Sequence, residues 1–343
     1  MTRDVIEYYR QFLADRWDLR EAVCVSYVHG IGEDTMIRAF GGDPAGTAPR
    51  SARDTGEEFA GLRYDRIPPV LLVASVGEWL IGVEYNGFQG SRPEVLRGAS
   101  SGGTAVSVYW NVNGTNRFTC ATGGRTAVGF DMRRPEDRFG AAPDALAAQL
   151  DGLDFGYGGD AYAAGLALAE RVTGVRLTGA LLDGTYRRAV LRPVPPDLVP
   201  EGLAGHPALD EPFVRAVLAA PTADKIPAVS RYLAEAIARD ADIGDVPEIR
   251  AAIGALRAGS PDPALRRRVQ DLAERYRQGF REGRETLNRV HAALGVAAAL
   301  DPDPIKGSAE VFGMASYTLR TPDYRVQCVV LRQCRDRAVS QQR

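Results

Sequence analysis

Residues 69–132 constrain the fold more than any other part of the chain, because apolar and polar residues alternate there between glycine-containing breaks. Such alternation places apolar side chains on one face of a β-strand. The breaks at Gly77-Glu78, Asn113-Gly114 and Gly123-Gly124 suit tight hairpin turns, with positive φ expected at both Asn113 and Gly114. The segment therefore predicts a five-strand antiparallel meander as the core. Its strands are expected at 71–76, 79–85, 105–112, 117–122 and 125–132.

The segments on either side of this meander predict the helices that cover it. Apolar residues three or four positions apart indicate a helix over 3–17, with Ile6, Tyr9, Leu13 and Trp17 on its buried face. Further helices are expected at 33–40, 143–153 and 160–172, and further strands at 23–28 and 175–182. Residues 43–66 lack periodicity and predict a surface loop.

A proline-rich segment predicts the domain boundary. Residues 192–202 contain four prolines in eleven residues, which is incompatible with a helix or a central strand. We therefore predict an α+β domain at 1–192, a linker at 193–205 and an all-α domain at 206–343. The helices of the second domain are expected at 211–219, 227–239, 247–257, 261–294, 309–319 and 322–337.

Composition narrows the class of protein. The chain has 343 residues, 45% of which are hydrophobic. Its formal net charge is −2, so it lacks the overall positive charge that favours binding to nucleic acid or to an anionic membrane. No apolar run reaches the length of a membrane span, and the N-terminus lacks the pattern of a signal peptide. These features predict a cytoplasmic protein.

The metal-binding residue types are scarce and scattered. The four cysteines lack CxxC spacing, which predicts buried, reduced thiols, and the three histidines form no local metal motif. We expect no metal and no cofactor. His29 at a strand end could act as a general base, but a lone histidine in a turn is more often structural or solvated.

The turn at residues 29–33 resembles a phosphate-binding loop, since glycines there follow a strand and precede a helix. However, Glu33 and Asp34 occupy the first helical turn, where they would repel a phosphate. A plain strand-to-helix turn is favoured.

The candidate binding residues lie near the ends of two predicted strands. Aromatic and amide side chains at a sheet rim are typical of recognition surfaces. The alternative is that Trp79 and Trp110 belong to the core and that Asn86 and Asn113 only form turns. The proposed set is Glu84, Asn86, Phe88, Gln89, Trp110, Asn111 and Asn113.

The predicted helix at 261–294 carries an arginine-rich face that includes Arg266, Arg277, Arg281 and Arg284. Such a face could bind nucleic acid. Acidic residues are interspersed with these arginines, so a solvated face of salt bridges is favoured.

The N-terminal half resembles an uncharacterised actinobacterial family classed as a domain of unknown function, over about residues 5–185. Four motifs carry the resemblance: CVSYVHGIGEDTMIRAFGGDP at 24–44, EWLIGVEYNGFQGS at 78–91, VYWNVNGTNRFTCATGG at 108–124 and FDMRRPEDRFGAAPDAL at 130–146. The second motif is also similar to strands of α+β immunity proteins from bacterial toxin systems. The family resemblance implies no activity or cofactor.

Three functional hypotheses follow. The favoured one is a non-catalytic protein-interaction module, such as an immunity or conflict-system component, in which the sheet rim binds a protein partner and the helical domain modulates binding or oligomerises. The second is an enzyme that uses Glu84 or Asp131 as an acid or base in a cleft. The third is nucleic-acid binding through the arginine-rich helix.

Overall fold

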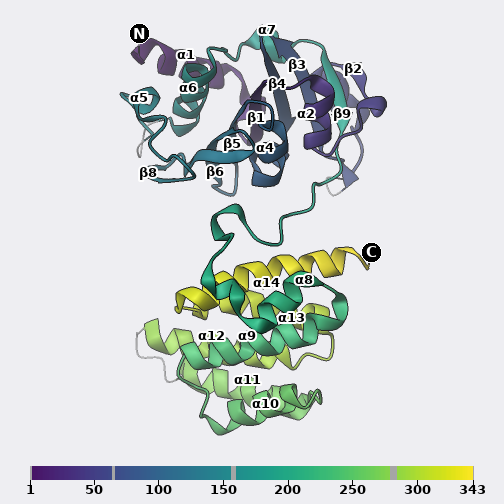
Figure 1. Ribbon diagram of the computed structural model, residues 1–343, viewed down its shortest axis with the longest axis vertical. Coiled ribbons are helices and arrows are strands. Elements are labelled where there is room, and N and C mark those ends of the chain that lie inside the picture. The colour runs from purple at the N-terminus through teal and green to yellow at the C-terminus, as the bar shows by residue number, and fades with distance from the viewer. Residues whose placement is uncertain (1, 64–65, 156–159, 279–283, 343) are drawn as a thin grey trace. The chain divides into compact units, whose positions relative to one another are not determined.

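The computed structural model describes residues 2–63, 66–155, 160–278 and 284–342. The chain divides into two compact units, residues 1–195 and residues 196–343. The first unit combines an antiparallel sheet with helices, and the second consists of helices (Figure 1). The expected α+β fold followed by a helical region is confirmed. That each unit folds alone stays a prediction.

Among the described residues the sheet contains nine strands in the order β2-β9-β3-β4-β1-β5-β6-β7-β8, and every pair is antiparallel. The strands are β1 (Ala22–His29), β2 (Ala48–Arg50), β3 (Val70–Val76), β4 (Trp79–Tyr85), β5 (Thr104–Asn111), β6 (Asn116–Thr122), β7 (Arg125–Asp131), β8 (Arg134–Phe139) and β9 (Tyr186–Val190).

The predicted uninterrupted meander is wrong, because β1 lies between β4 and β5. Val25 of β1 pairs with Val83 of β4 on one side and with Val108 of β5 on the other. Six consecutive residues of β1, 23–28, are buried, as expected for a central strand covered on both faces. Local alternation identifies each of these strands but does not report which distant strand pairs with it.

Helices cover both faces of the sheet (Figure 1). On one face, α1 (Thr2–Asp15) and α6 (Ala161–Thr173) pack on a core that includes Tyr27, Val83 and Trp110. On the other face, α2 (Glu33–Ala39) and α4 (Pro93–Ala99) pack on a core that includes Val28, Met36 and Leu80. Successive side chains of a strand point to opposite faces, so neighbouring residues of β4 reach different cores.

Three local predictions in this unit are wrong. The predicted loop at 43–66 contains β2 and helix α3 (Ala52–Glu58), which begins with a capping box at Ser51. The predicted helix at 143–153 is reduced to α5 (Ala147–Leu150). The predicted strand at 175–182 holds the short helix α7 (Gly179–Leu182) instead, and the closing strand β9 follows it. Short elements carry too few residues for a clear periodic pattern.

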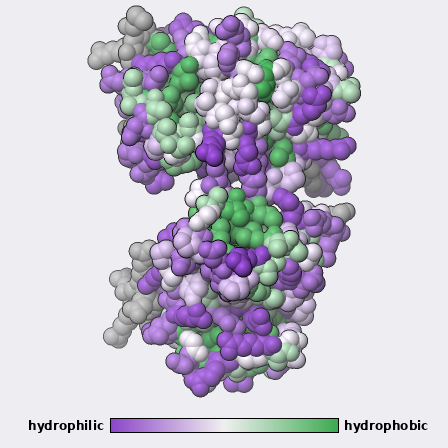
Figure 2. Space-filling model, viewed as in Figure 1, coloured by the Kyte–Doolittle hydropathy of each residue, from purple (hydrophilic) through white to green (hydrophobic). Residues whose placement is uncertain are grey.

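The second unit is a bundle of helices. They are α8 (Pro212–Ala219), α9 (Ile226–Asp240), α10 (Pro247–Arg257), α11 (Pro263–Gln278), α12 (Arg284–Ala299), α13 (Pro304–Thr318) and α14 (Pro322–Ser340). None of the described helices is both long enough and apolar enough to cross a bilayer. Hydrophilic side chains cover most of the visible face, and an apolar patch interrupts them in this unit (Figure 2).

The predicted single helix at 261–294 is wrong, because α11 and α12 are separate helices that pack against each other. Their apolar stripes face a shared core instead of forming one continuous seam. The sequence between them contains Gly279 and Gly283, and glycine is a poor helix former. Residues 279–283, including Arg281, lie outside the described residues.

The turn between β5 and β6 also differs from the prediction. Gly114 has a φ of +81°, but Asn113 is not among the described non-glycine residues with positive φ. The side-chain oxygen of Asn111 accepts hydrogen bonds from the N–H groups of Asn113 and Thr115, at 3.0 and 3.1 Å. The loop is therefore organised by the Asn111 side chain and one left-handed glycine, not by a two-residue primed turn.

We therefore expect Gly114→Ala to lower the free energy of unfolding by about 1 kcal/mol, because only glycine adopts positive φ without strain. Asn113→Ala in the same loop should change it by less than about 0.5 kcal/mol. Denaturant titrations followed by tryptophan fluorescence measure both, since all three tryptophans lie in the first unit. A larger loss of unfolding free energy in Asn113→Ala than in Gly114→Ala would instead support the two-residue primed turn.

Candidate functional site

Glu84 is the one charged residue of the predicted set, and it is fully buried. Alternation along β4 turns it toward the face covered by α2 and α4, and its exposed fraction is 0%. Its two carboxylate oxygens accept hydrogen bonds from the backbone N–H groups of Gln89, at 2.9 Å, and Gly90, at 2.7 Å. Glu84 thus ties the loop that follows β4 back onto the sheet.

Small, buried side chains surround Glu84. Cys24 Sγ lies 3.3 Å from the Ser107 hydroxyl and 3.9 Å from that of Ser26. Burial raises the pKa of Glu84 from its ordinary 4.5 to about 7, although the two N–H donors act in the opposite direction. Burial, and then the nearby Glu84 carboxylate, also raise the pKa of the Cys24 thiol. This arrangement is an internal anchor for a loop.

The remaining predicted residues divide between core and surface. Gln89 and Trp110 are buried, and the Trp110 indole N–H donates to the Leu19 carbonyl at 2.7 Å. The surface members are Asn86, Phe88, Asn111 and Asn113; the Phe88 side chain is 50% exposed.

These surface members lie at one end of the sheet, because Tyr85 and Asn111 both stand opposite the first residues of β1. The structure therefore brings the loop after β4 and the loop after β5 to the same end of the sheet. Trp110 and Glu84 were expected to contribute aromatic and charged contacts to a partner at this end of the sheet, but both side chains are buried inside the protein.

Glu84 and Asp131 are not brought together. Three strands separate β4 from β7, so the two carboxylates are about 19 Å apart at the usual strand spacing. Asp131 accepts a hydrogen bond from the Arg133 N–H group at 2.9 Å. The two carboxylates therefore do not converge in one pocket, and the enzyme hypothesis gains no support from their arrangement.

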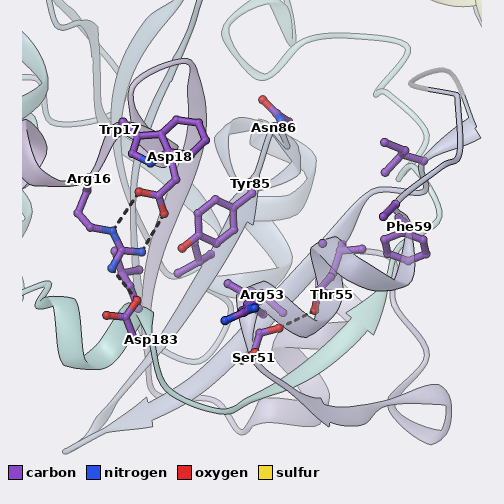
Figure 3. Close-up of a pocket in the computed structure, with 18 of the residues that line it drawn as sticks. Arg16, Trp17, Asp18, Ser51, Arg53, Thr55, Phe59, Tyr85, Asn86 and Asp183 are labelled. Carbon is purple, nitrogen blue, oxygen red and sulfur yellow. Dashed lines mark hydrogen bonds and ion pairs between the residues drawn. The ribbon is translucent and has the colours of Figure 1, made fainter.

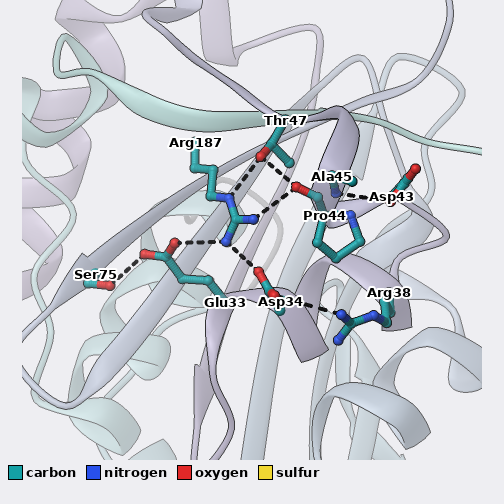
Figure 4. A network of polar contacts seen from close by, with 9 residues as sticks. All are labelled: Glu33, Asp34, Arg38, Asp43, Pro44, Ala45, Thr47, Ser75 and Arg187. Carbon is teal, nitrogen blue, oxygen red and sulfur yellow. Dashed lines mark hydrogen bonds and ion pairs between the residues drawn. The ribbon is translucent and has the colours of Figure 1, made fainter.

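The glycine-rich turn at 29–33 leads into α2, and its two acidic residues contact an arginine (Figure 4). The Arg187 guanidinium on β9 bonds to Asp34 at 2.6 Å and lies 3.5 Å from Glu33. It also donates to the Thr47 hydroxyl and the Pro44 carbonyl. The two acidic side chains at the start of α2 therefore already have a cationic partner within the protein. Through these contacts Arg187 links that helix to the sheet.

The other singled-out residues have structural partners. The His29 ring packs on Trp79 at 5.3 Å, and His206 accepts a hydrogen bond that caps a short helix. The four cysteines are buried and unpaired. In the described parts of the chain, no group of three histidine, cysteine, aspartate or glutamate side chains is placed to hold a metal ion.

Three arginines of α11 form ion pairs. Arg266 pairs with Asp301 at 2.7 Å. Arg275 pairs with Glu248 and Arg277 with Glu274, at 2.5 and 2.6 Å. These pairs compete with any phosphate that would bind there. The Arg284 side chain lies outside the described residues.

A groove with a volume of about 1100 Å³ opens on the sheet face that carries α1 and α6 (Figure 3). Its floor is formed by β3 and β4, one side by residues 15–18 at the end of α1, and the opposite side by α3 and the segment that follows it. Leu182 and Asp183 at the end of α7 complete the wall. Three regions that are far apart in sequence, 15–18, 51–86 and 182–183, therefore contribute to one concave surface.

The groove has a polar end and an apolar end. At the polar end, the Arg16 guanidinium bonds to Asp18 at 3.0 and 2.8 Å and to Asp183 at 2.7 Å. Figure 3 shows the Tyr85 side chain between this cluster and α3, with Phe59 beyond. The Tyr85 hydroxyl is buried and makes no hydrogen bond of normal length within the described residues. Burial raises the pKa of Tyr85 to about 12, and Asp18 adds to the increase.

Sequence reasoning missed this groove. Trp17 was expected on the buried face of the first helix, but α1 ends at Asp15 and the Trp17 side chain is 76% exposed. Leu62, which is 48% exposed, belongs to the expected loop at 43–66, and Ile67, which is 43% exposed, directly follows that loop. The available signal was a set of large apolar residues inside a segment without periodicity.

A family model described as "Family of unknown function (DUF6461)" matches residues 4–195, which is more than half of the chain. No curated protein and no solved structure matches the chain. The chain belongs to this family, and the match extends over the unit that contains the groove.

Proposed function

We propose that this member of the DUF6461 family is a non-catalytic binding protein that holds a segment of a partner protein in the groove of its first unit. One observation carries the proposal: large apolar side chains stand exposed around a single concave surface. Trp17, Leu62 and Ile67 all line the groove, and each is more than 40% exposed. Exposed apolar side chains that cluster around a concavity are typical of protein-binding sites.

The size of the groove supports a segment of a chain. Its volume of about 1100 Å³ is at the upper end of the range for small-molecule pockets. Aromatic anchors such as Trp17 and Tyr85 contribute large contact areas at binding surfaces.

The polar groups of the groove favour binding over catalysis. The ionic groups at its polar end are held in ion pairs, since Arg16 bonds to both Asp18 and Asp183. The raised pKa of Tyr85 keeps its hydroxyl protonated at neutral pH, so this group acts as a hydrogen-bonding partner and not as a base.

Photo-crosslinking identifies the partner. A photoreactive amino acid at position 62, inside the groove, should capture it in cells that produce the full chain, whereas the same probe at position 112 should not. Val112 is a matched control because it is 74% exposed but lies in the loop after β5.

The purified partner is then titrated against variants of the full chain. Trp17→Ala should weaken binding by about tenfold or more, as truncation of an aromatic anchor does at other interfaces. Val112→Ala should leave the dissociation constant unchanged. Unchanged binding by Trp17→Ala, or an equal loss in both variants, would contradict the proposal.

The setting of this function is part of the proposal. We place the protein in the cytoplasm of an actinobacterium, where the partner belongs to an immunity or conflict system. The motif at 78–91, which contains β4 and the loop after it, supports this setting. It is similar to strands of immunity proteins, and its loop is tied down by Glu84 next to the groove residue Asn86.

A further inference from the structure

We propose that the partner segment presents a basic side chain, lysine or arginine, to the polar end of the groove while its apolar residues occupy the rest. This inference rests on the proposed function and adds the chemistry of the partner. The observation behind it is a surplus of negative charge beside an apolar floor.

The surplus is visible in the ion pairs. Three carboxylates, Asp15, Asp18 and Asp183, line the groove together with two guanidinium groups, Arg16 and Arg53. The Arg16 guanidinium uses all three of its nitrogens on Asp18 and Asp183. Asp15 has no ion-pair partner among the described residues. Over the whole lining, three carboxylates against two guanidinium groups leave one negative charge, and Arg53 lies on the opposite side of the groove from the three carboxylates.

Asp183 offers an accessible carboxylate oxygen. Its Oδ1 atom accepts from Arg16, whereas no hydrogen bond to its Oδ2 atom occurs within the described part of the chain. Its side chain is 69% exposed. An incoming cation can therefore bond to Asp183 without breaking the existing pair.

The Tyr85 hydroxyl adds a second acceptor. It is buried, lacks a hydrogen bond of normal length in the described residues, and points toward the Arg16 cluster (Figure 3). A hydroxyl oxygen has two acceptor lone pairs, so a ligand N–H group that reaches it can bond to it alongside the nearby Arg16 guanidinium. Lysine and arginine side chains are pure donors, which matches an oxygen acceptor and a carboxylate acceptor side by side.

The floor explains why the basic residue must be accompanied by apolar ones. Leu72 and Val83 are 2% and 0% exposed and form a rigid apolar surface, which Ile67 and Phe59 continue on the far side. Arg53, on the α3 side, is already bonded to Glu57 at 2.9 Å. An acidic segment would meet the surplus negative charge, and the two cations that line the groove, Arg16 and Arg53, are both already paired.

Three matched peptides test the inference on the full chain: acetyl-Leu-Leu-Xaa-amide with arginine, glutamine or glutamate as Xaa. Titrations by NMR should show that the arginine peptide binds about three- to fivefold more tightly than the glutamine peptide, the size expected for one exposed charge pair. The glutamate peptide should bind most weakly. The preference for arginine should shrink as salt rises.

Two variants locate the effect. Asp183→Asn and Tyr85→Phe should each reduce the arginine preference. Asp144→Asn should not, because Asp144 is also an exposed aspartate in an ion pair, 84% exposed and bonded to Arg138, but does not line the groove. Thermal melts confirm that the variants are folded.

The outcomes separate the two proposals. Equal binding of the three peptides would overturn the inference about charge and leave the groove as a binding site. A preference that Asp144→Asn removes as strongly as Asp183→Asn would also overturn it. Binding of none of the peptides would count against the proposed function itself, and the inference would fall with it.

Discussion

The first unit will lose about 3 kcal/mol of unfolding free energy as the pH rises from about 4.5 to above 7, through Glu84 alone. The pKa of this carboxyl is raised from 4.5 to about 7 in the folded protein. The native state therefore binds more protons than the unfolded state between these values, and stability must fall as pH rises through them. A shift of this size corresponds to about 1.4 kcal/mol per pKa unit.

Glu84→Gln tests the assignment. At about pH 4.5 the variant should be less stable than the natural protein by about 2 kcal/mol. The amide nitrogen of the new glutamine replaces one of the two accepting oxygens, and its N–H₂ group then faces the backbone N–H donor of Gln89 or Gly90. The difference should shrink as the pH rises, since only the natural protein has to bury a charge.

Denaturant titrations at several pH values, followed by tryptophan fluorescence, measure this difference in the full chain. Glu78→Gln is the matched control, because Glu78 lies in the turn before β4 and its side chain is 90% exposed. The control should follow the pH profile of the natural protein. Parallel profiles for the natural protein and Glu84→Gln would show that another group is responsible.

Gly90→Ala will lower the free energy of unfolding by about 2 kcal/mol, the usual cost of overpacking a well-filled interior. A Cβ atom at position 90 would overlap the Ser26 hydroxyl and lie 3.0 Å from both Cys24 Sγ and Glu84 Oε2. The neighbours belong to central strands and to the anchor, so they cannot all move aside.

A second substitution identifies the cause. Ser26→Ala removes the overlapping hydroxyl, so the double variant should recover more than half of the loss, which is a coupling of about 1 kcal/mol between touching residues. Gly179→Ala is the control, since its added Cβ meets nothing within 4 Å and it should change stability by less than about 0.5 kcal/mol. Additive losses in the double variant would mean that the strain lies elsewhere.

Local sequence pattern was sufficient for most of the long elements of this protein, the helix predicted at 261–294 being the exception. Alternation predicted β3 to β7 with errors of at most one residue at their ends, and the period of 3.6 predicted α1, α6 and α9. These signals survive because each strand or helix must turn one row of apolar side chains toward a core, whatever its neighbours are. The boundary between the two units was predicted from the four prolines at 192–202, which are also a local signal.

Pairing, burial and the groove depended on tertiary structure. The place of β1 between β4 and β5 is set by contacts across more than fifty residues of sequence, which no local period records. Glu84 was selected for the rim because it lies near the end of a predicted strand, yet two backbone N–H groups five and six residues later allow its burial.

The groove is decided in the same way, because its walls come from the ends of α1 and α7, from α3 and from two strands. The sequence alone determined which segments become strands and helices, since that depends on neighbours along the chain. Only the tertiary structure decided which side chains meet, since Trp17, Tyr85 and Asp183 face one concavity only after the sheet and its helices have packed.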